Sequence, residues 1–383
     1  MGELRGRPRE RRRVLITRAV PPMALSPLDV VVPGAIRTRT GGYVYDRRLV
    51  EALRERGRTV VVHELDGPWP QPDEVTRERA HALFAALPDG RHALVDGLAF
   101  GALPDVASSA GERLSLIALV HHPLALEGGL SSDDEARIRH AEQRALASAA
   151  HVLTTSPATT AALVTDYGVA ADRVTTVPPG TDPAPRASGT PGGAENLLCV
   201  ATLTRRKGHD VLLDALAGLV DRPWHLVCTG SATRDRATAD ALRERIRQLD
   251  LAARVTLDGE LDDTALAERW QAADLFVLAS RFEGYGMVFD EAFARALPVL
   301  ASGAGAVADT VPTDAGLVVP PDDVDALRTA LARWFDEPEL RDALRAGAGR
   351  ARESRRDWHT VADEVGHVID ALPARRPSAD RPA

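Results

Sequence analysis

Two short segments in the second half of the chain contain residues suited to binding anions and hydroxyl groups. The first, TRRKGHD (204–210), includes Arg206 and Lys207, and Lys207 is the only lysine among 47 lysines and arginines. A compact ammonium on a flexible stem suits one phosphate oxygen, whereas a guanidinium is a planar fork. The second, RFEGYGMVFDE (281–291), includes Glu283 and Glu291. Carboxylates accept hydrogen bonds from hydroxyl groups such as those of a sugar.

The position of TRRKGHD favours phosphate binding. It follows the apolar run LLCVATL (197–203) and precedes the helical pattern DVLLDALAGLV (210–220). The start of a helix offers free N–H groups and a partial positive charge, to which Arg206 and Lys207 would add. The alternative is a solvated turn with Asp210 as helix cap.

The second segment follows the apolar run DLFVLAS (274–280), and Gly284 and Gly286 flank Tyr285. Glycines let a backbone approach a ligand closely and turn successive N–H groups toward it. The alternatives are that Glu283 is a charge at a helix start and that Glu291 pairs with Arg295 four residues on.

These segments belong to a repeated strand–helix pattern that predicts two doubly wound α/β domains. Apolar runs at 59–65, 92–98, 114–120 and 151–156 are continuous, which is typical of parallel strands covered on both faces. The pattern stops at 181–195, rich in proline and glycine, and then restarts. Ligands of such sheets bind beyond the carboxyl ends of the strands, so a cleft between the domains is expected. The predicted organisation is a disordered basic tail (1–22), domains over 23–185 and 186–355, a helix crossing back (356–372) and a disordered tail (373–383).

Composition excludes several classes of protein. A net charge of −8 argues against nucleic-acid binding. No apolar run approaches the roughly 18 residues of a membrane span, and the N-terminus lacks the pattern of a signal peptide, so a cytoplasmic protein is expected. Cys199 and Cys228 lie in short apolar runs and are predicted to be core strand residues, without zinc-site spacing or a disulfide framework.

Four motifs in order resemble the family-4 retaining glycosyltransferases of the GT-B fold. They are TGGYVYDRRLVEALRERG (40–57), LVHHPLALE (119–127), ATLTRRKGHDVLLDAL (201–216) and the E-x7-E pair Glu283 and Glu291. The resemblance spans roughly residues 29 to 370. Many members have an arginine where this chain has Thr202, so the first phosphate contact falls to Arg205 or Arg206.

The resemblance implies a role for each matching residue. Arg206 and Lys207 would hold the donor diphosphate, Glu291 the ribose, and Glu283 with the following loop N–H groups the transferred sugar. The candidate catalytic residues are His122, Arg206, Lys207 and Glu283. The candidate donor-binding residues are Gly41, Gly42, Arg206, Lys207, Gly230, Glu283, Gly284, Tyr285, Gly286, Met287 and Glu291. The candidate acceptor-binding residues are Tyr43, Asp96 and His121. Either His121 or His122 reaches the cleft, with His122 favoured. Asp96 follows a predicted strand, and its position at the strand end leaves three interpretations: it orients the acceptor hydroxyl, acts as the base for that hydroxyl, or caps a loop.

The implied reaction transfers a sugar, with retention, from a nucleotide-diphosphate sugar (UDP- or GDP-linked) to an acceptor. No metal or other cofactor is expected, because the acidic pairs Asp133–Asp134 and Asp262–Asp263 are interpreted as helix caps. The alternatives are a non-catalytic nucleotide-sugar-binding partner of another transferase and a GT-B nucleotide-sugar epimerase. The sequence leaves open the acceptor, peripheral contact with a membrane, and a monomeric or homodimeric state.

Overall fold

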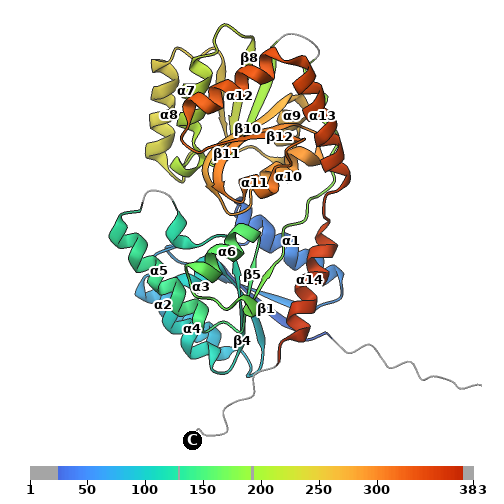
Figure 1. Ribbon diagram of the computed structural model, residues 1–383. Helices are drawn as coiled ribbons and strands as arrows, with labels where there is room; N and C mark the ends of the chain where they lie inside the picture. The colour runs from blue at the N-terminus through green and yellow to red at the C-terminus, as the bar shows by residue number, and fades with distance from the viewer. Residues whose placement is uncertain (1–24, 128–129, 191–193, 374–383) are drawn as a thin grey trace, which may run out of the picture.

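The computed structural model describes residues 25–127, 130–190 and 194–373. It shows two α/β domains, each built on a parallel sheet (Figure 1). The predicted tail 1–22, and the predicted tail 373–383 apart from its first residue, lie outside the described residues. Among the helices of the described residues, none has both the length and the apolarity needed to span a membrane.

The first domain has a six-stranded sheet in the order β2-β1-β3-β4-β5-β6. Its strands are β1 (Leu28–Pro33), β2 (Val60–Leu65), β3 (His92–Asp96), β4 (Ser115–Val120), β5 (His151–Thr154) and β6 (Val174–Thr176). Its helices are α1 (Gly41–Glu55), α2 (Glu74–Ala86), α3 (Gly97–Ala102), α4 (Pro104–Gly111), α5 (Ser132–Ala147) and α6 (Pro157–Thr165), with short 3₁₀ turns η1 (Leu124–Leu126) and η2 (Ala171–Arg173).

The second domain has a six-stranded sheet in the order β12-β11-β10-β7-β8-β9. Its strands are β7 (Glu195–Val200), β8 (Trp224–Thr229), β9 (Val255–Gly259), β10 (Leu275–Glu283), β11 (Val299–Gly305) and β12 (Gly316–Val319). Its helices are α7 (His209–Ala217), α8 (Arg236–Gln248), α9 (Asp263–Ala272), α10 (Met287–Ala294), α11 (Val307–Thr310), α12 (Val324–Asp336) and α13 (Pro338–Glu353), and the 3₁₀ turn η3 (Arg205–Lys207) precedes α7.

Continuous apolar strands arise because both faces of each sheet are covered. Val31 of β1 packs into one core cluster, whereas Val30 and Val32 pack into another. Side chains alternate across a strand, so these clusters lie on opposite faces of the first sheet. The fold class predicted from the apolar runs is therefore confirmed.

The last helix, α14 (Trp358–Ala371), packs on the first domain although α13 packs on the second (Figure 1). Trp358 and Ile369 join the core cluster that contains Leu49 of α1. The rings of Trp358 and Tyr45 meet edge to face, 5.4 Å apart. The chain thus connects the domains twice, through the segment after β6 and again before α14.

Candidate active site

The central feature of the site is a buried carboxylate held by two cations. Lys207 Nζ lies 2.6 Å from Glu283 Oε1, and an Arg206 guanidinium nitrogen lies 3.5 Å from Oε2. Ser280 Oγ also donates to Glu283 Oε1. Burial raises the pKa of Glu283, but the charges of Lys207 and Arg206 outweigh it and the pKa is lowered. The structure therefore brings together three of the predicted site residues, with Glu283 ionised at neutral pH.

Local backbone geometry sets these cations against the sheet. Gly208, between η3 and α7, has φ +61°, and a Cβ there would overlap the carbonyl oxygen of Ala279 on β10. Only glycine fits this left-handed, closely packed position. Asp210 lies in the first turn of α7 and pairs with Arg281 at 2.8 Å. The alternative interpretation of Asp210 as the helix cap is wrong, because Gly208 occupies the cap position.

The loop between β10 and α10 lies against the first domain. A Cβ on Gly284 would overlap the carbonyl oxygen of His121 and lie 2.9 Å from the His122 Cβ. Gly286 precedes α10 with φ +92°, and Tyr285 donates to Asp290 at 2.7 Å. Met287, the first residue of α10, packs against the core cluster of the first domain. Gly284 therefore permits close contact between the domains.

Glu291 lies one turn further along α10, at a cavity of about 160 Å³ between the domains. The cavity is lined from both domains: Val44, Arg48, Gly180, Thr181, Asp182, Pro183, Ala184, Met287, Glu291, Arg295 and Trp358. Burial raises the pKa of the Glu291 carboxyl. Arg295 donates to the main-chain oxygen of Glu291 at 2.7 Å. This hydrogen bond does not use the carboxylate oxygens of Glu291.

Of the two neighbouring histidines, His121 is held inside the first domain. Its Nε2 lies 3.1 Å from Asp46 Oδ1 and 3.4 Å from Asp96 Oδ2. Burial lowers the pKa of His121, but the two carboxylates outweigh it and raise it to about 10. Asp96 also accepts from Leu98 N at 2.8 Å, so it caps α3 while it contacts His121.

His122 connects to the cations of the second domain through Glu127. Its Nε2 lies 2.9 Å from one Glu127 oxygen, and the other accepts from Arg206 Nε at 3.1 Å. Burial raises the pKa of Glu127, but the hydrogen bond with His122 and the charge of Arg206 lower it to about 2. Glu127 thus bridges the domains as a carboxylate.

The remaining predicted residues lie around these groups. Gly41 begins α1, and a Cβ on Gly42 would be 3.0 Å from the His121 ring. Tyr43 donates to the main-chain oxygen of Pro33, and burial, with the Asp96 carboxylate, raises its pKa to about 12. Gly230 follows β8 with φ +151°, against the carbonyl of Ala201.

Sequence reasoning assigned no role to three residues that the structure places in the site. Ser280 donates a hydrogen bond to Glu283, and Asp46 pairs with His121. Glu127 contacts both Arg206 and His122. Glu127 lay within the quoted motif LVHHPLALE, so its carboxylate near two histidines was a usable signal. Asp46 on an otherwise apolar helix face was a second one.

Two groups of the described residues have ligand atoms close enough to hold a metal ion: Asp46, Asp96 and His121, and Cys199, His209 and Cys228. In the first group the His121 imidazolium itself supplies the cation. Of the predicted capping pairs, Asp262 accepts from Ala265 N and caps α9. Asp133 and Asp134 instead lie in the first turn of α5, whose cap is Ser131, so that prediction is wrong.

Comparison with known proteins agrees with this fold. Residues 40–185 match the family model described as Glycosyltransferase Family 4, and residues 181–350 match the model for glycosyl transferases group 1. The two matches together run from the start of α1 into α13 and include the Lys207–Glu283 cluster. Together with the two α/β domains of a GT-B fold, these matches show that the chain belongs to glycosyltransferase family 4.

Curated relatives share about a third of the matched residues. D-inositol 3-phosphate glycosyltransferase of Kineococcus radiotolerans is 31% identical over 269 residues, covering 63% of this chain and 60% of the relative. Mannosylfructose-phosphate synthase of Agrobacterium fabrum is 30% identical over 240 residues, covering 57% and 52%. A GDP-mannose-dependent mannosyltransferase of Corynebacterium glutamicum that acts on a phosphatidylinositol monomannoside is 31% identical over 187 residues, covering 46% and 47%. The chain thus spans about half of the length of these relatives.

Solved structures show the same fold at lower identity. Sucrose-phosphate synthase from Thermosynechococcus elongatus superposes with a TM-score of 0.77 at 23% identity, covering 91% of this chain and 99% of that one. Anabaena HepE in complex with UDP-glucose gives a TM-score of 0.73 at 18% identity, covering 90% and 100%.

Proposed function

We propose that the protein is a metal-independent retaining glycosyltransferase that moves a sugar from a UDP- or GDP-sugar to an acceptor hydroxyl. The observation that carries the proposal is the Lys207–Glu283–Arg206 cluster at the ends of β7 and β10. This cluster has two cations and a carboxylate at the carboxyl edge of a parallel sheet, where such folds bind ligands. A UDP-sugar complex and a GDP-mannose-dependent enzyme among the related proteins support both nucleotides as candidates.

Charge on the leaving group sets the demand on the protein. As the bond between the anomeric carbon and the β-phosphate oxygen breaks, negative charge accumulates on the diphosphate. Arg206, Lys207 and the N–H groups at the start of α7 stabilise that charge more than they stabilise the bound donor. The acceptor oxygen then bonds to the anomeric carbon on the same face, and its proton passes to the departing phosphate oxygen.

Glu283 is a poor candidate for a covalent nucleophile. One of its oxygens accepts from Lys207 and Ser280, and the other faces Arg206 at 3.5 Å. Such hydrogen bonds lower the basicity of a carboxylate and fix its orientation. We assign to it the positioning of sugar hydroxyls, and to Glu291 the ribose. In the first domain, the cluster of His121, Asp46 and Asp96 is the group available to orient the acceptor.

Calorimetric titration with UDP, GDP, ADP and dTDP, in the presence of EDTA, tests the proposal. One nucleotide should bind in the micromolar range, and Lys207→Ala should weaken it by more than tenfold. Arg243→Ala is the matched control, because that arginine is a half-exposed cation of α8 paired with Asp240. Absence of nucleotide binding, or equal binding by Lys207→Ala, would refute the donor site. Binding that requires an added divalent ion would refute metal independence alone.

A further inference from the structure

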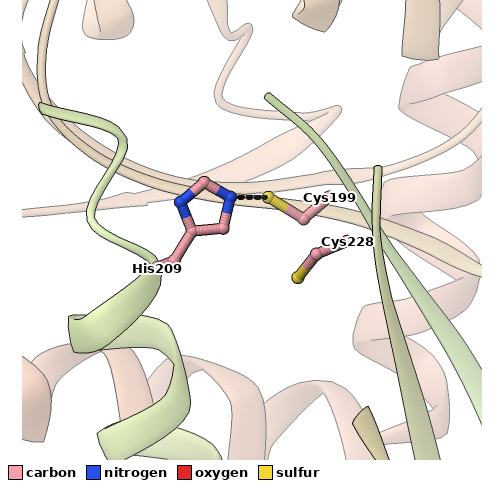
Figure 2. A group of neighbouring side chains, drawn as sticks. All are labelled: Cys199, His209 and Cys228. Carbon is pink, nitrogen blue, oxygen red and sulfur yellow. Dashed lines mark hydrogen bonds between the residues drawn. The ribbon is translucent and has the colours of Figure 1, made fainter. Parts of the chain in front are cut away.

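Two cysteines and a histidine meet in the core of the second domain (Figure 2). The histidine begins α7, which follows η3, the turn that carries Arg206 and Lys207. Cys199 of β7 and Cys228 of β8 are aligned partners in adjacent parallel strands. Their side chains therefore leave the same face of the sheet. His209, the first residue of α7, points its imidazole toward them (Figure 2). All three residues are at most 3% exposed.

The geometry of the three side chains matches a metal site. Cys199 Sγ and His209 Nε2 are 3.6 Å apart. The two sulfurs and one ring nitrogen of His209 all lie within 4.8 Å of one another. Ligands bound to zinc at its usual Zn–S and Zn–N lengths in tetrahedral geometry are separated by about 3.5 Å. Little movement is needed to bring all three onto one ion.

The chemistry of the ligands selects the class of ion. Thiolate and imidazole ligands favour thiophilic metals such as Zn²⁺ and Cu⁺ over Mg²⁺ or Ca²⁺. Binding Zn²⁺ releases the two thiol protons, and two thiolates with a neutral imidazole leave the occupied site uncharged. A neutral complex can be buried without the large cost of an unpaired charge.

We propose that Cys199, Cys228 and His209 form a structural site for a thiophilic metal ion, either Zn²⁺ or Cu⁺. Among the described residues these three supply the ligands, which suits three-coordinate Cu⁺, or Zn²⁺ with a small fourth ligand from solution. The ion would tie β7, β8 and the start of α7 together. His209 lies two residues after Lys207, so the bound ion would hold η3, the turn that carries Arg206 and Lys207, in place without contacting the donor.

The test measures metal binding and not sugar transfer, so its outcome is independent of the proposed function. The reduced full-length chain is incubated anaerobically with Zn²⁺ or Cu⁺ in separate arms, dialysed, and analysed for metal by mass spectrometry. Cys199→Ser, Cys228→Ser and His209→Gln remove one ligand each. His225→Gln is the matched control, because His225 lies on β8 but is exposed.

We expect about one ion per chain in the wild type and in His225→Gln, and less than a tenth of that in the three ligand variants. The ion should raise the melting temperature of the wild type and of His225→Gln, but not that of the three ligand variants. Equal metal content in wild type and folded ligand variants would overturn the proposal, as would absence of binding in both arms. For variants that do not fold, X-ray absorption of the loaded wild type decides, and a coordination shell without sulfur would also overturn it.

Discussion

Lys207 and Glu283 are ion-paired, with Nζ 2.6 Å from Oε1. Both side chains are largely buried, 16% and 6% exposed. The cation assigned to the donor phosphate is therefore already neutralised, and a diphosphate must compete with Glu283 for it. The pair also keeps the ammonium from being an isolated charge in a poorly hydrated cleft.

Replacing this carboxylate should separate binding from catalysis. The Glu283→Gln substitution removes one negative charge from the site, so its net charge becomes more positive by one unit. We therefore expect the nucleoside diphosphate to bind two- to tenfold more tightly. Transfer should fall by about 10²–10³, because the hydrogen bonds to the sugar in the transition state are weakened. Calorimetry with the diphosphate and a turnover assay with the donor measure the two effects.

The control for charge alone is Glu339→Gln, an exposed glutamate at the start of α13. It should change neither quantity appreciably. Weaker diphosphate binding by a folded Glu283→Gln variant would show that the carboxylate supports the cations and does not compete for them.

The contact between Gly284 and His121 predicts a defect in domain closure. An alanine Cβ at 284 would overlap the His121 carbonyl oxygen, which is backbone and cannot rotate away. Gly284→Ala should therefore hold the domains apart and lower turnover more than tenfold, with little change in melting temperature. Small-angle scattering should show a larger radius of gyration. Gly349→Ala on α13, whose nearest neighbouring atom would be 3.7 Å away, is the control. Unchanged scattering and turnover in Gly284→Ala would contradict this view of the interface.

The fold was predictable because its signal is local. A run such as Val30 to Val32 is apolar without alternation, and only a strand covered on both faces requires that. Glycines at loop ends marked the position of Lys207 and Glu283 beyond the strands. The family matches agree with the motifs that suggested the resemblance.

Pairings across the sheet were not predictable from local patterns. Lys207 and Glu283 are 76 residues apart and meet only because β10 lies beside β7. Cys199 and Cys228 looked like isolated core residues, and their burial confirms that prediction. Their shared contact with His209 depends on the β7–β8 register, which no spacing in the sequence encodes. The pairing of Glu127 with Arg206 was unpredictable for the same reason, since Arg206 is in the other domain, whereas its place beside two histidines was a local signal.

The buried carboxyl of Glu142, which binds the loop after His121 and His122, should make the stability of the protein depend on pH. Glu142 of α5 is 3% exposed and accepts from Leu124 N at 2.8 Å and from Ala125 N at 3.4 Å. Burial raises its pKa to about 7 from 4.5, although those N–H groups oppose the rise. Between these two values the unfolded chain loses this proton before the folded chain does. The contribution of Glu142 to stability is thus complete below pH 4.5 and lost as the pH rises to about 7.

Glu142→Gln should remove this contribution to the pH dependence while keeping an oxygen that accepts from the N–H groups of the loop. A shift from 4.5 to about 7 corresponds to about 3 kcal/mol between the two ends of the range. Urea unfolding at several pH values from 4.5 to 7.5 measures the free energy of unfolding. The difference between wild type and Glu142→Gln should move in favour of the variant as the pH rises, because glutamine has no proton to lose. Parallel pH profiles for the two proteins would mean that Glu142 ionises in the folded state with an ordinary pKa. In that case its carboxylate would hold the loop that carries Glu127 as an anion.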